Sequence, residues 1–206
     1  MIGSYLTGSL PFGFWIGLAH GKDIRQIGSG NVGATNVIRI LGWGPGLLVF
    51  VLDVLKGAVP SYFAAQWQSS NPLFAGISPL DFGLICGVVA VVGHMLSPFL
   101  AFRGGKGVAT GLGALLGVAP IVGISGFLGF LVVLGLTRYV SLGSIAGALT
   151  VMVAAVFTGQ SPLLLTIFGL LCIYIVYRHV PNMKRLKEGT EPKIGQKVTA
   201  PEPEHD

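Results

Sequence analysis

Charged residues are scarce in this chain of 206 residues: Asp, Glu, Lys and Arg make up 10% of it, against roughly a quarter in a soluble domain. Together with a hydrophobic content of 52%, this scarcity excludes an ordinary water-soluble enzyme and an intrinsically disordered protein. Two cysteines are too few for a disulfide framework, and 32 glycines without a triplet period exclude collagen. An integral membrane protein remains.

Long stretches without a charged residue predict the membrane-spanning helices. Such runs cover residues 1–19, 57–80, 82–102, 107–137 and 139–177. We expect residues 1–19 to form one membrane helix, and a further helix at 40–64 to contain Asp53 and Lys56 on one face. The run at 107–137 is too long for one crossing, so a break near Pro120 divides it into two short helices. A turn at 158–162 divides the last run in the same way.

Basic residues gather on one side of the predicted membrane. Twelve of the thirteen Lys and Arg lie in the segments 20–39, 103–106, 138 and 178 onward. By the positive-inside rule these segments face the cytoplasm, so the excess of positive charge requires no nucleic-acid partner. The predicted fold is all-α: a polytopic membrane protein with seven transmembrane helices, its N-terminus outside and its C-terminus cytoplasmic. A single domain is expected over 1–185, with a polar cytoplasmic tail at 186–206.

The first basic segment contains a polar, glycine-rich motif, Gly-Ser-Gly-Asn-Val-Gly-Ala-Thr-Asn at 28–36. Its glycines allow tight turns in which backbone N–H groups converge on an anion, and Ser29, Asn31 and Thr35 add side-chain donors. Arg39 can pair with a phosphate through two hydrogen bonds. A phosphate site is therefore one interpretation, and a flexible loop with a helix N-cap at Asn31 or Thr35 is the other.

A second glycine-rich motif surrounds a lysine at a predicted helix start. Gly104, Gly105 and Gly107 flank Lys106, which would place backbone donors, a positive helix end and an ammonium group at one point. This pattern favours anion binding. Alternatively, Lys106 and Arg103 anchor the topology at the membrane interface, and the glycines allow close helix packing.

Two further polar clusters fall on the same predicted face. Ser141 follows Arg138 at a helix junction, where a helix cap is an equally good interpretation. His179 and Asn182 are about one helical turn apart if the helix continues through Pro181, and such a pair can position a substrate hydroxyl. The alternative for this segment is a polybasic membrane anchor.

Three ionisable residues fall inside predicted spans. Asp53 and Lys56 are expected to neutralise each other as a structural pair, with a proton relay as the alternative. His94 is either a functional residue or a neutral histidine bonded to a neighbouring helix. A channel would scatter polar residues along its spans, whereas four polar clusters here share one face. The lack of a Cys/His or carboxylate cluster argues against a metal centre.

Three long motifs carry a family resemblance: the one at 28–36, Gly-His-Met-Leu-Ser-Pro-Phe-Leu-Ala-Phe-Arg-Gly-Gly-Lys-Gly-Val-Ala-Thr at 93–110, and Arg-His-Val-Pro-Asn-Met-Lys-Arg-Leu at 178–186. They resemble the PlsY family of bacterial acyl-phosphate:glycerol-3-phosphate acyltransferases. The resemblance implies a seven-helix protein of the bacterial cytoplasmic membrane with its active site facing the cytoplasm. The implied reaction transfers a fatty acyl group from acyl phosphate to the 1-hydroxyl of glycerol 3-phosphate, giving lysophosphatidic acid and phosphate, the first acylation of phospholipid synthesis.

The resemblance also assigns expected roles to single residues. Catalytic roles are expected for Ser29, Lys106, His179 and Asn182, and substrate binding for Asn31, Thr35, Arg39, Gly104, Gly105, Gly107 and Ser141. Glu191 is expected to serve structural integrity. No cofactor is implied, while membrane lipid and a soluble acyl-phosphate synthase are expected partners.

Two alternatives to direct acyl transfer accompany these expectations. The first is an acyl-Ser29 intermediate, which needs an activating base. The second belongs to another class of protein, a membrane transporter of a phosphorylated metabolite. A transporter would show a second polar site on the outer face, and the sequence contains none.

Overall fold

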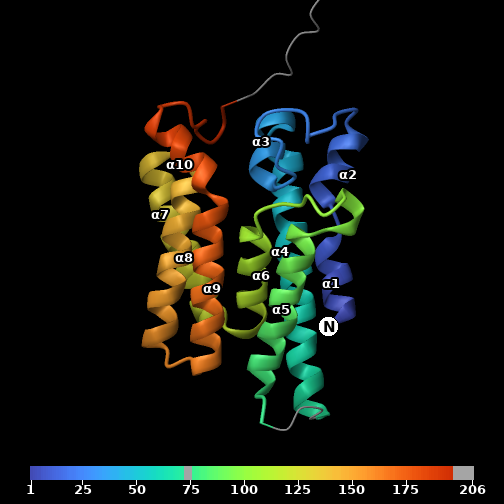
Figure 1. Ribbon diagram of the computed structural model, residues 1–206, viewed down its shortest axis with the longest axis vertical. Coiled ribbons are helices and arrows are strands. Elements are labelled where there is room, and N and C mark those ends of the chain that lie inside the picture. The colour runs from blue at the N-terminus through green and yellow to red at the C-terminus, as the bar shows by residue number, and fades with distance from the viewer. Residues whose placement is uncertain (72–75, 197–206) are drawn as a thin grey trace, which may run out of the picture.

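The computed structural model describes residues 1–71 and 76–196, and helices are the only regular secondary structure in these ranges (Figure 1). In chain order they are α1 (Ile2–Ser9), α2 (Phe12–Ala19), α3 (Ala34–Leu41), α4 (Trp43–Ser70), α5 (Pro79–Met95), the 3-10 turn η1 (Pro98–Leu100), α6 (Val108–Val118), α7 (Pro120–Thr137), α8 (Val140–Phe157), α9 (Pro162–Arg178) and α10 (Val180–Lys187). They form two groups that stand side by side, α1 to α6 and α7 to α10 (Figure 1).

Helix length and composition confirm an all-α protein with membrane-spanning helices. Four helical stretches are long and apolar enough to cross a membrane: α4, α5 with its continuation to Leu100, α7 and α8. A fifth span results if α9 and α10, which are bent by 46° at their junction, are taken together. The remaining predicted spans correspond to α6, which is a shorter apolar helix, and to the α1–α2 segment. The number seven and the orientation therefore stay predictions.

Proline and glycine determine where the helices break. α6 ends at Val118 and α7 begins at Pro120, with one residue between them, as predicted, and the turn between α8 and α9 confirms the division expected at 158–162. Residues 1–19, in contrast, do not form one helix. The chain breaks at Leu10 and Pro11, because the proline ring removes a hydrogen-bond donor and clashes with the preceding turn.

The helix predicted at 40–64 also has different ends. Gly42 has a φ of 93°, in the left-handed region, and separates α3 from α4. The long helix therefore begins at Trp43 and continues to Ser70. Residues 72–75, and residues 197–206 of the predicted polar tail, lie outside the described residues. The domain division at 185 stays a prediction, although the chain beyond it returns to the bundle and buries Glu191.

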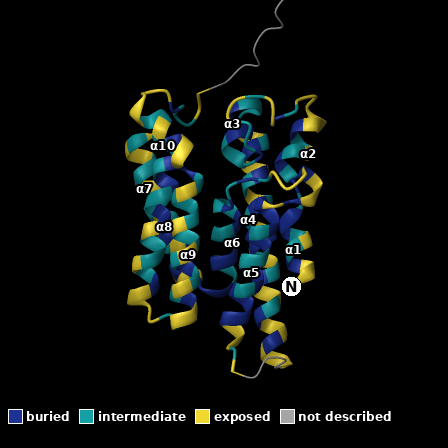
Figure 2. Ribbon diagram, in the orientation of Figure 1, coloured by how far each residue is buried: buried dark blue, intermediate teal, exposed yellow. Residues whose placement is uncertain are grey.

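Buried residues concentrate along α4, α5 and α6, while exposed residues mark the loops and outer faces (Figure 2). One apolar cluster fills the space between the two groups, and consists of Ala65, Leu84, Leu115, Val118, Ala119, Val122, Ala155, Leu164 and Phe168. A second cluster holds the first loop against α4, and consists of Ile24, Val32, Val37, Val49 and Leu100. Inside a membrane such clusters are stabilised by close packing rather than by removal from water.

Candidate active site

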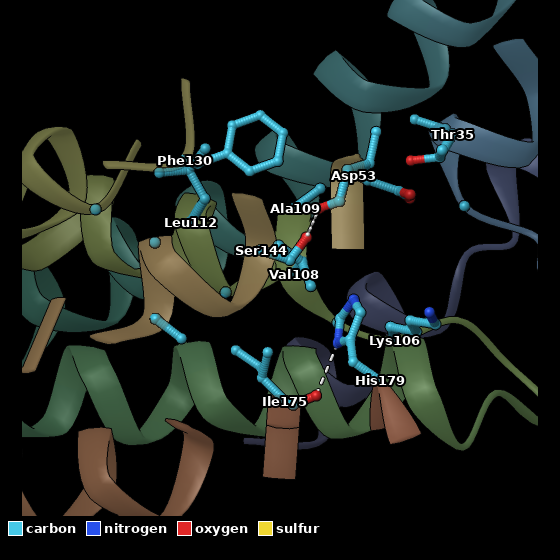
Figure 3. A pocket seen from close by; sticks show the side chains of 18 of the residues that line it. Thr35, Asp53, Lys106, Val108, Ala109, Leu112, Phe130, Ser144, Ile175 and His179 are labelled. Carbon is cyan, nitrogen blue, oxygen red and sulfur yellow. Dashed lines mark hydrogen bonds between the residues drawn. The ribbon is translucent and has the colours of Figure 1, made fainter. Parts of the chain in front are cut away.

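A pocket lies between the two helix groups and collects most of the predicted site residues (Figure 3). Its polar end is lined by Ser29, Asn31, Thr35, Arg39, Lys106, Gly107, Ser141, His179, Asn182 and Glu191. These residues come from the first loop and α3, the glycine-rich loop before α6, the start of α8, and the segment from the α9–α10 junction onward. The fold therefore brings the four predicted polar clusters to one place.

Asn36, which the sequence analysis did not single out, organises the first loop. Its side chain is 1% exposed. Its Oδ1 accepts a hydrogen bond from the backbone N–H of Ser29 at 3.0 Å, and its Nδ2 donates to the carbonyl oxygens of Ile24 and Ile27 at 3.0 and 3.1 Å. The position of this asparagine at the end of the motif 28–36 could have indicated the role, because Asn side chains commonly form hydrogen bonds with the backbone of a neighbouring turn.

The turns of this loop are formed by glycine. Gly28 and Gly30 have φ values of 65° and 66°, which glycine adopts without steric cost. Asn31 Oδ1 accepts from the N–H of Gly33 at 2.8 Å. The N-cap of α3 is Gly33. The alternative interpretation, which expected a helix N-cap at Asn31 or Thr35, is therefore wrong on this point.

Arg39 presents a buried guanidinium to the pocket from α3, with a residue exposure of 4%. One terminal nitrogen donates to the carbonyl oxygen of Pro192 at 2.9 Å, while its Nε has no hydrogen-bond partner in the part of the chain that the structure describes. Burial lowers the pKa of Arg39, but a guanidinium stays protonated in proteins. A buried cation with an unused donor is suited to an anionic ligand.

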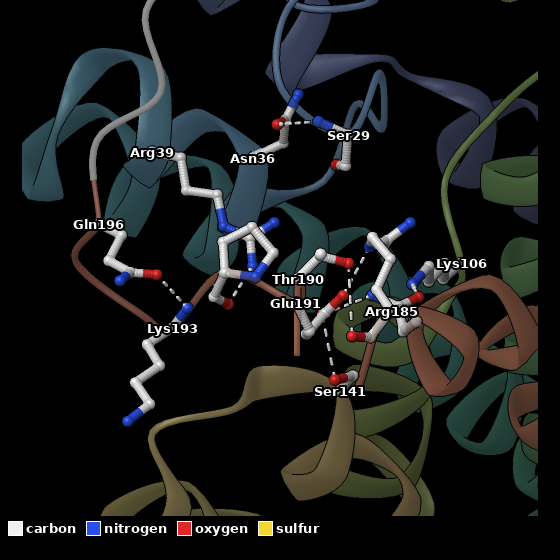
Figure 4. A network of polar contacts seen from close by, with 12 residues as sticks. Ser29, Asn36, Arg39, Lys106, Ser141, Arg185, Thr190, Glu191, Lys193 and Gln196 are labelled. Carbon is white, nitrogen blue, oxygen red and sulfur yellow. Dashed lines mark hydrogen bonds and ion pairs between the residues drawn. The ribbon is translucent and has the colours of Figure 1, made fainter. Parts of the chain in front are cut away.

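Lys106 begins a series of polar contacts that joins the two helix groups (Figure 4). Its Nζ donates to Asn182 Oδ1, and Asn182 Nδ2 donates to Glu191 Oε1 at 2.7 Å. Ser141 Oγ donates to the same carboxylate oxygen at 3.1 Å, and Arg185 Nε pairs with Glu191 Oε2 at 2.7 Å. Glu191 thus joins Asn182, Ser141 and Arg185 in one network.

The charges of this network are shifted by their surroundings. The pKa of Lys106 is lowered to about 8, chiefly by burial, with Glu191 raising it and the nearby arginines Arg185, Arg178 and Arg39 lowering it. Burial raises the pKa of Glu191, but hydrogen bonds from Asn182 and Arg185 outweigh it, so this pKa lies below its usual range. At neutral pH, Lys106 is therefore mostly a cation and Glu191 an anion.

His179 occupies the bend between α9 and α10 and is 2% exposed. Its Nδ1 lies 2.7 Å from the carbonyl oxygen of Ile175 (Figure 3). Because a carbonyl oxygen only accepts, Nδ1 carries the proton and Nε2 bears the lone pair. Pro181 stands in the first turn of α10, where proline is tolerated, so His179 and Asn182 share one helical turn as predicted.

The glycine-rich loop differs from the predicted phosphate site. The N–H of Gly104 donates to the carbonyl oxygen of Met95 at 2.9 Å, and that of Gly105 donates to His94 O at 3.2 Å. These two backbone donors therefore already have acceptors within the protein, and the expected substrate-binding role of Gly104 and Gly105 stays a prediction. What remains for an anion is Lys106 together with Gly107, the N-cap of α6 with a φ of 82°.

The other end of the pocket is apolar and reaches into the bundle. It is lined by Phe50, Leu84, Leu112, Leu115, Phe127, Phe130, Val151, Phe168, Leu171, Cys172 and Ile175. Along α9, Phe168 lies 179 − 168 = 11 residues before His179, which corresponds to about 16 Å of helix. The pocket therefore suits a molecule with an anionic head and a long apolar chain, with a proton acceptor between them.

Known proteins share this sequence and fold. A family model described as glycerol-3-phosphate acyltransferase matches residues 1–189. A glycerol-3-phosphate acyltransferase of Synechococcus elongatus is 48% identical over 201 residues, which cover 95% of this chain and 93% of the relative. One of Thermus thermophilus is 43% identical over 199 residues, with coverages of 96% and 94%.

Two crystal structures of PlsY, an integral membrane glycerol 3-phosphate acyltransferase, are similar throughout. The glycerol 3-phosphate form has a TM-score of 0.84 and 39% identity, covering 94% of this chain and 93% of that one. The lysophosphatidic acid form has a TM-score of 0.81 and 38% identity, with coverages of 95% and 93%. The chain therefore belongs to the glycerol-3-phosphate acyltransferase family.

Proposed function

We propose that this protein transfers a fatty acyl group from acyl phosphate to the 1-hydroxyl of glycerol 3-phosphate, giving lysophosphatidic acid and phosphate. Its family makes it an acyltransferase, which sets aside the transporter alternative. The observation that carries the proposal is the pocket, where Arg39, Lys106 and His179 meet at the mouth of an apolar channel. The cations suit the phosphates and the channel suits a fatty acyl chain.

The proposed reaction requires little beyond placement of the two substrates. Acyl phosphate is a mixed anhydride, so its phosphate leaves readily once the groups are oriented and charge is neutralised. The hydroxyl oxygen attacks the acyl carbonyl carbon while the bond to phosphate breaks, and the phosphate takes the electron pair. His179 Nε2 accepts the hydroxyl proton, and Lys106 and Arg39 neutralise the phosphate charges. The products balance without a cofactor.

Direct transfer is proposed in preference to an acyl-Ser29 intermediate. Ser29 is exposed, and within the described residues its hydroxyl has no base at hydrogen-bond distance. A serine nucleophile needs such an activating base. Incubation with labelled acyl phosphate alone tests this point, since a stable acyl group recovered on Ser29 contradicts direct transfer.

The function is tested with purified protein in detergent and both substrates. We expect lysophosphatidic acid to form in step with phosphate release. Phosphate release that is unaffected by omitting glycerol 3-phosphate contradicts the proposed acyl transfer.

The proposed topology has seven crossings in the bacterial inner membrane, with the N-terminus outside and the pocket mouth facing the cytoplasm. It is supported by the positions of the basic loops and by the family of the chain. The helix α6, with 11 residues, measures about 16 Å against a hydrocarbon core of roughly 30 Å. Local thinning of the bilayer around α6 is therefore part of the proposal. A soluble acyl-phosphate synthase as partner stays a prediction.

The rate is expected to depend on pH through Lys106, whose pKa is lowered by burial to about 8. Below this pH the amine is charged and binds the substrate phosphate, which remains a dianion above its second pKa of about 6. As pH rises through 8 the charge is lost, so kcat/KM for glycerol 3-phosphate falls. In Lys106→Arg the decline moves to higher pH, because arginine stays charged. Identical pH profiles in the two proteins contradict this assignment.

Phe168 is expected to set the preferred length of the acyl chain. Leu84, Leu115 and Phe168 belong both to the pocket wall and to the buried apolar cluster, so they close its deep end. Phe168→Ala opens room for longer chains, and discrimination between acyl phosphates that differ by a methylene or two changes by about 10-fold or more. Leu170→Ala is the control, since that side chain on the same helix is 64% exposed. An unchanged chain-length profile in Phe168→Ala contradicts the assignment.

A further inference from the structure

His94 is a buried ionisable residue that the proposed reaction does not use. It lies in α5 with 6% exposure, and its Nδ1 is 3.8 Å from Asp53 Oδ1. Asp53 forms an ion pair with Lys56 at 2.6 Å, and Lys56 Nζ donates to the carbonyl oxygen of Leu10 at 2.9 Å. One side of the imidazole therefore faces the Asp53–Lys56 pair of α4, at a distance beyond that of a hydrogen bond.

The other side of the imidazole supports the loop that carries Lys106. The N–H of Gly105 donates to the carbonyl oxygen of His94 at 3.2 Å. A Cβ at position 105 would overlap Nε2 of the His94 ring, and the three nearest atoms it would meet all belong to that ring. From the other helix group, Arg178 donates to the carbonyl oxygen of Gly105 at 3.1 Å. Gly105 is thus held between two side chains, directly before Lys106.

The glycine at 105 is required by this contact and not by its backbone angle. Gly107 has a positive φ, whereas Gly104 and Gly105 do not. The space that a side chain would need at position 105 is filled by the His94 ring. At position 104 the obstacle is different, because a Cβ there would overlap the backbone carbonyl of His94.

We propose that His94 is a positioning residue: its buried ring, packed between the Asp53–Lys56 pair and Gly105, fixes the backbone of Gly105 and thereby places Lys106 at the mouth of the pocket. The inference rests on the proposed function, since the position of Lys106 matters through the substrate phosphate. It explains why an ionisable residue is kept in α5 although it takes no part in the proton transfer.

The test uses the overlap itself. Gly105→Ala pushes the loop away from the ring, and a displacement of about 1 Å can lower kcat/KM by up to about 10²-fold. His94→Asn retains a polar group toward Asp53 but removes the ring atoms nearest to position 105. We therefore expect the double variant His94→Asn, Gly105→Ala to recover much of the activity that Gly105→Ala loses. Gly104→Ala is the matched control, and His94→Asn gives it no recovery because that obstacle is backbone.

The kinetic constants separate positioning from stability. His94→Asn alone is expected to raise KM for glycerol 3-phosphate severalfold, with KM for acyl phosphate and the thermal midpoint in detergent nearly unchanged. His94→Ala, which removes the contact with Asp53 as well, is expected to raise it further. Wild-type kinetics in both His94 variants, or a double variant no better than Gly105→Ala, overturns the inference while leaving the acyl transfer intact. Failure of the wild-type protein to transfer an acyl group overturns the proposed function instead.

Discussion

Replacement of Lys106 by Ala is expected to lower kcat/KM for acyl transfer by about 10²- to 10³-fold, the usual effect of removing one preorganised group that stabilises charge. The ammonium group is partly buried at the polar end of the pocket and is held by Asn182. Without it, the charge of the substrate phosphate is left to Arg39 and the helix end at Gly107. Asn182 also loses its contact with the opposite helix group, so the loss in rate includes some misplacement of the site.

Initial rates with acyl phosphate and glycerol 3-phosphate measure this effect. Lys106→Arg keeps the positive charge but changes its shape, and we expect an intermediate loss. Lys184→Ala is the matched control, because the Lys184 side chain is 76% exposed and its only ion pair is with Glu188 at 3.9 Å, within the described residues. A Lys106→Ala enzyme with more than about a tenth of the wild-type activity is inconsistent with a phosphate-binding role, given the size of such effects elsewhere.

Sequence alone predicts helix breaks well where two independent signals agree. The break at Pro120 follows from a charge-free run too long for one crossing and from basic residues at both its ends, 103–106 and 138, which face the same side. The structure confirms this break. Pro11 has the same chemistry, but residues 1–19 have the right length for a single span. Because that length fits one crossing, it gave no reason to predict the break that the structure shows at Pro11.

The composition of the site was predictable, whereas its connections were not. Glycine-rich motifs, and polar residues isolated in apolar surroundings, can be recognised from a short stretch of sequence. For this reason most of the predicted residues line the pocket. The contact between Lys106 and Asn182 spans 76 positions, and that between Ser141 and Glu191 spans 50. Such pairs depend on how two helix groups pack, and no local pattern encodes them. For the same reason the N–H groups of Gly104 and Gly105 were assigned to phosphate, although α5 provides their acceptors.

Replacement of Asp53 by Ala is expected to lower the free energy of unfolding by about 3–5 kcal/mol, because it leaves a buried charge without its partner. The side chains of Lys56 and Asp53 are 2% and 3% exposed and meet at 2.6 Å. Once Asp53 is removed, the ammonium keeps, among the described residues, the carbonyl oxygen of Leu10 and the face of the Phe12 ring, 5.6 Å from its centroid. Neither of these groups neutralises the charge.

The double variant Asp53→Ala, Lys56→Met separates the charge from the packing. Removing both charges of a buried pair is often neutral or stabilising, so this protein is expected to be more stable than Asp53→Ala alone. Glu188→Ala breaks the exposed pair with Lys184 and should change stability by no more than about 0.5 kcal/mol. Unfolding in mixed detergent micelles measures all three proteins. If the double variant is no more stable than Asp53→Ala, the cost comes from the cavity left by the carboxylate. The pair would then stabilise the protein by filling space. If the unpaired charge of Lys56 caused the loss, replacing Lys56 by the uncharged methionine would have restored stability.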